Sequence, residues 1–181
     1  MSQISLHSPS YQEMWYRKKL LSDPETMSYN KDLPMDIAGY NRSTGCILFP
    51  EKAWTFWFRR FLEREPDRYY AYVTSDGNFV GEASLISHGD KVYELSIVIE
   101  GAKRRIGFGK AAMKLLLERA FVTYGAAAVT NYFDESHEDA MKLHEMFGFE
   151  VTDKNVPLDE HEKVFVRVTL TREKYLSARK K

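Results

Sequence analysis

Alternating hydrophobic and polar residues predict several strands in the middle of the chain. The segments YYAYVTS and NFVGEASLIS flank Asp76-Gly77, a dipeptide typical of a hairpin turn. A second turn at His88-Gly89-Asp90 leads into KVYELSIVIE, residues 91–100. A strand at this position has two faces, one with Tyr93, Leu95, Ile97 and Ile99 and the other with Val92, Glu94, Ser96 and Val98. The pattern predicts three successive antiparallel strands.

A helical repeat of hydrophobic residues follows, from about Gly107 to Tyr124. Its apolar stripe consists of Phe108, Ala112, Leu115, Leu116 and Ala120, widened by Met113 and Leu117. A helix this apolar is expected to pack against a sheet. Two earlier helices are expected, one from Ser10 to Leu21 and one that Pro50 opens, with residues 22–49 as a loop. The second of them should pack its aromatic residues against the sheet: Trp54, Trp57, Phe58 and Phe61.

The last third of the chain continues the alternation of strands and helices. AAAVTNYF is expected as a strand, SHEDAMKLHEMF as a helix with Ser136 as its N-cap, and GFEV and KVFVRVTL as a final pair of strands. This order of elements predicts an α/β (α+β) fold, with a mixed, mostly antiparallel sheet and helices on both faces. We expect one domain over residues 1–181, with variable helices in 1–66 and the core in 67–170.

Composition limits the classes of function. Lys and Arg (26) balance Asp and Glu (26), so the formal net charge is zero, which argues against a dedicated nucleic-acid binder. Local basic clusters can still bind one phosphorylated ligand. The single cysteine, Cys46, excludes an intramolecular disulfide and is expected to be a small apolar filler. Because neither a signal peptide nor a membrane-spanning stretch is recognisable, we expect a cytoplasmic protein with no membrane partner.

The most informative segment is IVIEGAKRRIGFGKAAMKLLLERAF, residues 97–121. Gly107 and Gly109 lie where a loop becomes a helix N-terminus, and the free main-chain N–H groups there favour an anion. Positive charge is added by Lys103, Arg104, Arg105 and Lys110. The segment predicts a site for pyrophosphate or a similar anion at about residues 104–110. The alternative is an ordinary loop whose glycines permit unusual backbone angles.

The same glycines also satisfy the dinucleotide fingerprint G-x-G-x-x-A, from Gly107 to Ala112. In that fingerprint the glycines follow a strand almost at once, within a parallel βαβ unit. Here several basic residues separate Ile99 from Gly107, and a hairpin meander precedes the strand. The spacing makes a nicotinamide or flavin site the less favoured alternative.

Two motifs resemble those of the GNAT N-acetyltransferase family. Arg104-Arg105-Ile106-Gly107-Phe108-Gly109 is similar to the R/Q-x-x-G-x-G/A motif, which binds the pyrophosphate of coenzyme A through main-chain amides. Ala140-x-x-Leu143-x-Glu145-x-x-Gly148-Phe149 is similar to the family's A-x-x-L-Y-x-x-x-G-F. The resemblance extends from about Tyr69 to Val168, with the motifs in the family's order. Residues 1–66 match only in outline, as suits a family whose acceptor-binding region varies.

The resemblance implies a GNAT-like fold, acetyl-CoA as the co-substrate and a set of cofactor contacts. Main-chain groups of Val98 and Ile99 would hold the pantetheine arm. The pyrophosphate would be held by Arg104, Arg105, Ile106, Gly107, Phe108, Gly109 and Lys110. Asn131 would border the pantetheine, and His137 stands at a cofactor-side position where the family usually has Asn.

Two side chains are candidates for proton transfer. Glu94 interrupts an apolar strand and is the candidate base, since the family often has a base-supporting carboxylate there; the alternative is a solvated or ion-paired residue. His144 replaces the family's tyrosine, which is commonly assigned as the acid that protonates the departing thiolate. An imidazole with its ordinary pKa near ~6.5 can donate that proton. The alternatives are that His144 only fills the space of the tyrosine, or that Tyr132 supplies the hydroxyl.

These observations predict an enzyme that transfers acetyl from acetyl-CoA to a primary amine of a small molecule or peptide by direct attack. The alternative from another class is a non-catalytic module that binds acyl-CoA. We expect no metal, because His137 and His144 are too far apart along a helix to share one ion. The edges of the last strands are compatible with a homodimer. The expected acceptor side includes Tyr29, Asp32, Asp36, Tyr40 and Trp54.

Overall fold

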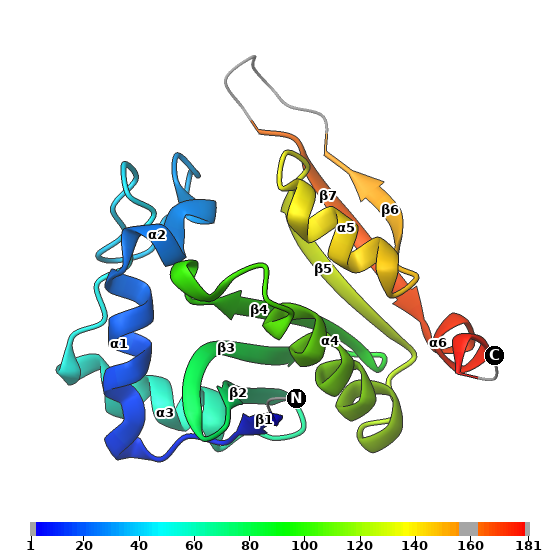
Figure 1. The fold of residues 1–181 in the computed structure, drawn as a ribbon, viewed down its shortest axis with the longest axis horizontal. Helices are drawn as coiled ribbons and strands as arrows, with labels where there is room; N and C mark the ends of the chain where they lie inside the picture. The colour runs from blue at the N-terminus through cyan, green and yellow to red at the C-terminus, as the bar shows by residue number, and fades with distance from the viewer. Residues whose placement is uncertain (1–2, 156–162, 180–181) are drawn as a thin grey trace. The chain divides into compact units, whose positions relative to one another are not determined.

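The computed structural model describes residues 3–155 and 163–179 (Figure 1). Its strands are β1 (Ile4–His7), β2 (Arg68–Ser75), β3 (Asn78–Ser87), β4 (Val92–Ile99), β5 (Ala128–Asp134), β6 (Glu150–Lys154) and β7 (Phe165–Thr171). Its helices are α1 (Met14–Ser22), α2 (Pro24–Met27), α3 (Trp54–Leu62), α4 (Phe108–Glu118), α5 (Glu138–Met146) and α6 (Arg172–Ala178). A π-helical turn, Arg119–Thr123, extends α4.

The strands form one seven-stranded sheet in the order β1-β2-β3-β4-β5-β7-β6. β4 and β5 are parallel, while β1–β2, β5–β7 and β6–β7 are antiparallel, so the predicted mixed, mostly antiparallel sheet is confirmed. Among the described strand residues, the β4–β5 ladder covers only Val92–Glu94 and Ala128–Thr130. β4 therefore continues to Ile99 beyond the end of this ladder.

The chain divides into two compact units, and the first consists of residues 1–84 and 97–115. Its best-defined cluster joins Met14, Tyr16 and Leu20 of α1 to Tyr70 and Tyr72 of β2. The aromatic residues of α3 pack against this cluster, as the sequence pattern predicted: Trp54, Trp57, Phe58 and Phe61. Because the alternate β2 residues Ala71 and Val73 are also fully buried, both faces of this strand are covered.

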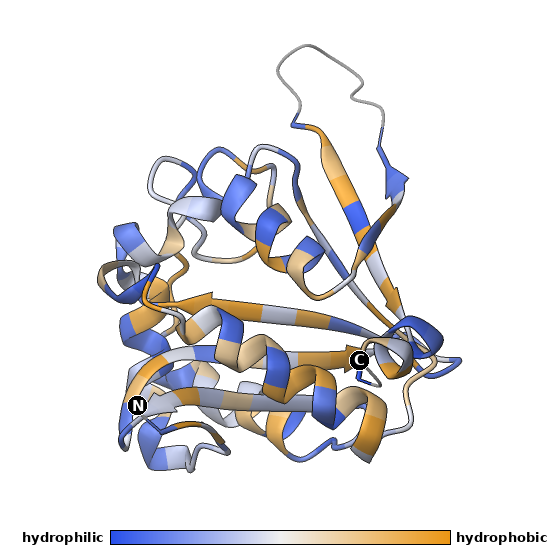
Figure 2. Ribbon diagram, turned by 45° about the vertical axis from the view of Figure 1, so that its right-hand side comes forward, coloured by the Kyte–Doolittle hydropathy of each residue, from blue (hydrophilic) through white to orange (hydrophobic). Residues whose placement is uncertain are grey.

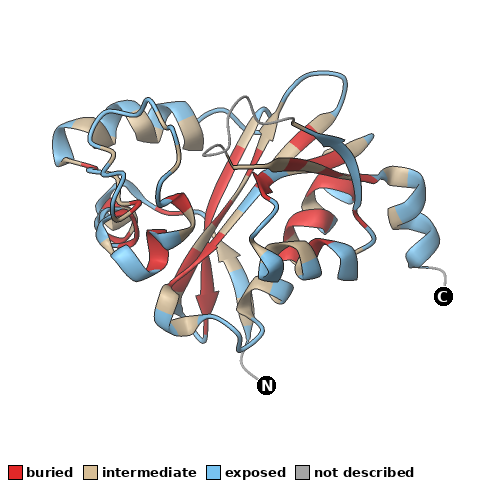
Figure 3. Ribbon diagram, turned by 90° about the horizontal axis from the view of Figure 1, so that it is seen from above, coloured by how far each residue is buried: buried red, intermediate tan, exposed pale blue. Residues whose placement is uncertain are grey.

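The second unit consists of residues 85–96 and 116–181. A continuous antiparallel ladder joins β5 to β7, from the pair Ala128–Thr171 to the pair Asp134–Phe165. The buried apolar residues of these two strands lie on one face: Val129, Phe133, Val166, Val168 and Leu170. α6 has no buried residue (Figure 3), but Tyr175 stacks on Phe121 with 4.5 Å between ring centroids.

Hydropathy follows this burial. Figure 2 shows hydrophobic residues along the central strands and alternating hydrophobic and hydrophilic residues along α4. The predicted stripe of α4 is buried at Ala112, Met113, Leu116 and Leu117, each at most 1% exposed. Within the described residues, no helix has the length and apolar character needed to cross a lipid bilayer.

Several elements differ from the sequence-based expectation. β1, α2 and α6 were not predicted, and the 22–49 segment is therefore not wholly a loop. Asp23 caps α2 by accepting hydrogen bonds from the N–H groups of Glu25 and Thr26, which lets Pro24 open a helix. The prediction of Ser136 as the N-cap of α5 was wrong: the cap is His137, while the N–H of Ser136 donates to Asp134.

A buried ion pair connects α1 to the sheet within the first unit. Arg17 Nη1 lies 2.5 and 2.6 Å from the two carboxylate oxygens of Glu82 on β3, and both side chains are largely buried. The guanidinium also lies over the Trp57 ring, 4.3 Å from its centroid, and Tyr70 donates its hydroxyl hydrogen to Glu82. Both charges are therefore removed from water, and each is stabilised by the other.

We expect the substitution Arg17→Met to lower the free energy of unfolding by about 3 kcal/mol, because it leaves the Glu82 carboxylate buried without its cation. Lys18→Met is the matched control, since Lys18 is exposed and only 3.7 Å from an exposed Glu51; its effect should stay within about 0.5 kcal/mol. Urea unfolding followed by circular dichroism measures both. Equal stability of the two variants would contradict this account.

Candidate active site

The loop between β4 and α4 has the backbone geometry of an anion site. Arg105 has φ 65° and Gly107 has φ 99°, both in the left-handed region. A Cβ added at Gly107 would meet no atom within 4 Å, so this turn has open space in front of it. The glycine thus supplies both a permitted backbone angle and room for a ligand to approach the main chain.

The first turn of α4 presents main-chain donors at this position. Its first helical hydrogen bond runs from the Ala111 N–H to the Gly107 carbonyl, at 3.1 Å. The N–H groups of Phe108, Gly109 and Lys110 precede that bond and therefore have no acceptor within the helix. Lys110 is exposed next to them. Donors, dipole and charge together fit a phosphate or pyrophosphate group.

The side chain of Arg104 contacts main-chain carbonyls of the protein. Its guanidinium donates to the main-chain carbonyls of Glu25 (3.3 Å) and Thr26 (2.5 Å) in α2, and to that of Ile99 (3.2 Å). The side chain therefore ties the loop to α2. In this structure, the expectation that Arg104 cradles the pyrophosphate applies at most to its main chain, because the side-chain donors are directed to protein carbonyls.

Glu100 anchors the start of the same loop, and sequence reasoning did not single it out. Its carboxylate, only 9% exposed as a residue, accepts from the Tyr16 hydroxyl (2.8 Å) and from Lys19 (3.0 Å), and pairs with Lys103 (3.0 Å). Burial alone would raise the pKa of Glu100, but these three donors hold it below its ordinary value. The one available signal was its position at the end of an apolar strand.

The first unit thus brings together most of the predicted cofactor residues. Val98 and Ile99 end β4 and are buried, whereas Arg105 and Ile106 are exposed in the loop, Ile106 at 66%. A close contact holds the loop against α2: the Gly101 N–H donates to Thr26 Oγ1 at 2.9 Å, and a Cβ at Gly101 would lie 2.4 Å from Glu25 Cγ. The loop therefore requires glycine at position 101, which the motif alone did not indicate.

Glu94, the candidate base, lies in the second unit. Its carboxylate is 3.1 Å from His88 Nε2, and both side chains are partly exposed. The β4–β5 register pairs Glu94 with Thr130, whose buried Oγ1 has no hydrogen-bond partner among the described residues. The residue in register with Glu94 on the neighbouring strand therefore carries a buried hydroxyl.

His144, the candidate acid, is buried on α5, at 3% exposure. Its Nδ1 lies 2.7 Å from the Ala140 carbonyl and its Nε2 lies 3.1 Å from Asn131 Nδ2. Since Asn131 Oδ1 already accepts from the Tyr132 N–H, its amide nitrogen faces the ring. The hydrogen bonds define a neutral imidazole with its proton on Nδ1. Burial lowers the pKa of His144, although the bond to the carbonyl opposes the shift.

The two candidates lie on opposite faces of the β4–β5 pair. Glu94 is in register with Thr130, and the next residue, Asn131, contacts His144. Because successive residues of a strand alternate between faces, the structure does not bring Glu94 and His144 together. Tyr132 shares the face of Glu94 and is 42% exposed, with its ring stacked 5.2 Å from that of Phe165.

The residues expected on the acceptor side have mostly structural contacts. The Tyr40 hydroxyl donates to main-chain carbonyls of the same segment, 2.6 Å from Asn30 and 3.0 Å from Leu33, and Trp54 Nε1 donates to the Phe49 carbonyl. Tyr29 is packed against the cluster of Leu21, Met27 and Phe49, with Cys46 beside it as a filler. Asp32 and Asp36 remain as exposed or partly exposed carboxylates.

Comparison with known proteins agrees with this arrangement. The model of the acetyltransferase (GNAT) family matches residues 36–149, more than half of the chain. No protein with a curated function matches significantly. Among solved structures, spermidine N-acetyltransferase from Vibrio cholerae, in complex with CoA and spermine, has a TM-score of 0.76 at 16% identity over 96% of this chain and 98% of that one. A GNAT-family acetyltransferase from Bacillus anthracis has a TM-score of 0.71 at 11% identity, over 96% and 98%.

The chain therefore belongs to the acetyltransferase (GNAT) family. Its seven-stranded sheet is the GNAT fold, which confirms the expected fold class and rules against the dinucleotide-binding alternative. As a member of this family, the protein is an acetyltransferase.

We expect the His144 imidazole to titrate below its ordinary pKa of 6.5 and to show the nitrogen shifts of the Nδ1-protonated form. Because the folded state disfavours the imidazolium, the stability contributed by His144 is present above pH 6.5 and is lost as the pH falls through the folded-state pKa. Nitrogen-15 NMR measures both properties. Asn131→Asp should raise the pKa by placing a carboxylate beside the ring, whereas a proton found on Nε2 of the parental protein would contradict the assignment.

Proposed function

We propose that the enzyme binds acetyl-CoA at the β4–α4 turn and transfers its acetyl group to a primary amine of a small molecule or peptide. The observation that carries this proposal is the open space at Gly107, next to first-turn amides of α4 that have no acceptor within the helix. These features match what a diphosphate requires: close approach to the main chain, several N–H donors and a favourable dipole. The spermidine N-acetyltransferase of similar fold, solved with CoA and spermine, supports the choice of ligand.

In this proposal the main chain from Arg105 to Lys110 holds the pyrophosphate, and the exposed Lys110 ammonium adds charge. The side chains of Glu100, Lys103 and Arg104 hold the loop in shape. Val98 and Ile99 contribute main-chain groups of β4, beyond the end of the β4–β5 ladder, to the pantetheine arm. Bound acetyl-CoA supplies an activated thioester, so no covalent intermediate with the enzyme is needed.

Glu94 is the proposed base. An alkyl amine is mostly protonated at neutral pH, so its proton must be removed before it can attack a carbonyl. The Glu94 carboxylate is accessible and has a polar surrounding of His88 and the unpartnered Thr130 hydroxyl. We infer that Glu94 accepts the amine proton, directly or through a water molecule, and that His88 orients the carboxylate.

The leaving thiolate needs a proton, and the proposed donors are the Tyr132 hydroxyl and the His144 ring. Two observations favour Tyr132. The Nε2 atom of His144 accepts a hydrogen bond, so it has no proton to donate in this tautomer. Tyr132 is exposed on the same face of the sheet as Glu94. In this scheme His144 and Asn131 act as positioning residues that fix the main chain of β5, since Asn131 Oδ1 accepts from the Tyr132 N–H.

We expect Gly107→Ala to weaken coenzyme A binding by about tenfold or more. The added methyl group enters the space that the phosphate occupies, and a non-glycine residue at positive φ costs about 1–2 kcal/mol. Gly89→Ala is the matched control, because Gly89 has φ 86° and equally open surroundings but lies in the β3–β4 turn. Isothermal titration calorimetry gives both affinities. Unchanged binding by the Gly107 variant would remove this turn from the site.

We expect Glu94→Gln to lower kcat about 100-fold near neutral pH while the affinity for acetyl-CoA stays unchanged, because the amide cannot accept a proton. Release of free thiol is measured with a panel of acceptors: a polyamine, an amino acid, an aminoglycoside and a peptide N-terminus. His88→Asn, which keeps the carboxylate, should have a smaller effect. A parental pH–rate profile in the Glu94 variant would exclude it as the base.

A further inference from the structure

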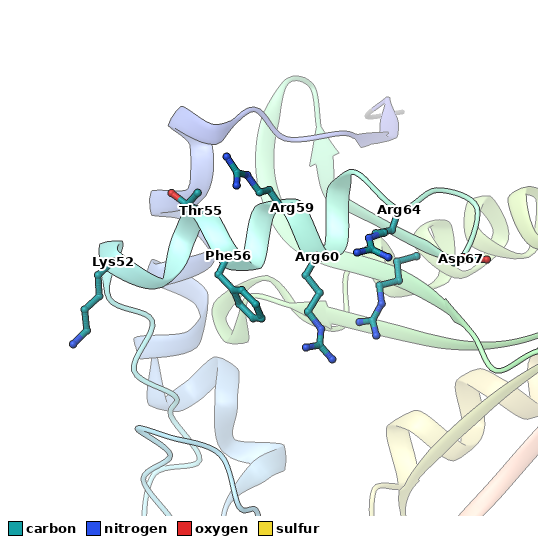
Figure 4. A pocket seen from close by; sticks show the side chains of 8 residues that line it. Lys52, Thr55, Phe56, Arg59, Arg60, Arg64 and Asp67 are labelled. Atoms are coloured by element: carbon teal, nitrogen blue, oxygen red, sulfur yellow. The ribbon is translucent and has the colours of Figure 1, made fainter.

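A basic groove of about 630 Å³ lies along α3 in the first unit, and the acetyl-transfer proposal does not use it (Figure 4). It is lined by Lys52, Thr55, Phe56, Arg59, Arg60, Arg64, Asp67 and Arg68. Five of these side chains are cations and one is a carboxylate, in a protein whose formal net charge is zero. None of the residues from the β4–α4 turn contributes to the lining, so the groove is a separate feature.

Four of the five cations of the groove have no acidic partner in the part of the chain that the structure describes. Within residues 3–155 and 163–179, no carboxylate lies within 4.0 Å of the charged groups of Lys52, Arg59, Arg60 or Arg64. Elsewhere in the protein the exposed cations are often paired, as Lys142 is with Glu138 at 2.9 Å. Like charges that line one groove repel one another, and a bound polyanion would remove that repulsion.

An exposed aromatic ring lies among these cations. Phe56 is 70% exposed, and it leaves α3 on the same side as Arg60, whose guanidinium is 5.9 Å from the ring centroid (Figure 4). The other large aromatic residues of α3 face the core, so Phe56 is not part of the packing described above. An open ring beside an arginine is an arrangement on which nucleobases stack while cations hold the adjacent phosphates.

The composition of the groove distinguishes between polyanions. Arginine, which supplies four of the five cations, pairs with phosphate through two parallel hydrogen bonds and also stacks on planar groups. A membrane surface would require more apolar anchors than the single Phe56. An acidic peptide could neutralise the cations, but it would not account for the exposed Phe56 ring. The cations extend along the whole of α3 to Arg68 at the start of β2, more than one phosphate can neutralise.

We propose that the α3 groove binds single-stranded nucleic acid, with the arginines on its phosphates and Phe56 stacked on a base. The zero net charge of the chain argued against a dedicated nucleic-acid binder. Binding at this groove, however, depends on the local charge, because charges farther away than about 10 Å are screened. Binding of a single strand at this groove would hold the acetyltransferase on a nucleic acid.

The test uses the whole chain and a fluorescently labelled single-stranded RNA of about 12 nucleotides, a length within the range of single-strand site sizes. Saturating coenzyme A is present, so the probe cannot occupy the cofactor site. Fluorescence anisotropy gives the affinity at several salt concentrations. Three variants are compared with the parental protein: Phe56→Ala, the pair Arg60→Gln with Arg64→Gln, and a control pair, Arg42→Gln with Lys114→Gln, which removes two exposed charges elsewhere.

We expect the arginine pair to bind at least tenfold more weakly, with a salt slope smaller by about 1.4, because each neutralised phosphate of a single strand contributes about 0.7 to that slope. Phe56→Ala should bind several-fold more weakly with an unchanged salt slope, since it removes stacking and no charge. The control pair should bind as the parental protein does. All variants should keep the parental affinity for coenzyme A, which separates this test from that of the proposed function.

Several results would overturn the proposal. One is the absence of RNA binding at low salt, and another is an equal weakening in the control pair, which would show non-specific attraction. Displacement of the RNA by polyglutamate at equal charge, with Phe56→Ala unaffected, would indicate an acidic protein partner instead. Tighter binding to anionic phosphatidylserine vesicles than to RNA would indicate a membrane surface.

Discussion

The buried carboxylate of Glu100 is the constraint on which the proposed cofactor site depends. It lies where β4 ends, and removing it from water would be unfavourable without the hydrogen bonds of Tyr16, Lys19 and Lys103. Two of these donors belong to α1 and one to the loop itself. The charge therefore joins an N-terminal helix to the strand that leads into the anion-binding turn. Any change that displaces α1 is transmitted to the turn through this group.

Arg104 adds a second attachment, to the main chain of α2. Its three hydrogen bonds go to carbonyl oxygens, two of which belong to the four-residue helix α2; the Glu25 carbonyl also accepts from the Ser28 hydroxyl. Different groups of one motif therefore have different roles. The side chains hold the loop in place, and the main-chain amides stay available for the proposed ligand. In the proposed site, Gly107 admits the ligand, while the charge of Arg104 is used to hold the loop.

The sequence predicted the elements whose patterns are local. The Asp76-Gly77 hairpin, the apolar stripe of α4 and the glycines at its start all follow from neighbouring residues. Of the missed elements, β1 depends on contacts distant in the chain. β1 has four residues and exists through its register with β2, from Ile4–Ser75 to His7–Tyr72. The support of the site was missed for the same reason, since nothing in GAKRR indicates that Glu100 meets Tyr16 across 84 positions.

The exchange of tyrosine for histidine at position 144 shows why a motif cannot assign a mechanism by itself. The hydroxyl of a tyrosine lies at the far end of a long side chain, where it can donate a proton. An imidazole buried between Phe133 and Phe149 must instead find hydrogen-bond partners for both of its nitrogens within the core. The Ala140 carbonyl and the Asn131 amide do so, and the pKa of the ring falls with burial. A neutral ring with an accepting Nε2 stabilises β5 well and donates a proton poorly. The chemistry of the leaving thiolate is then expected to depend on a group at the exposed face of β5, where Tyr132 lies.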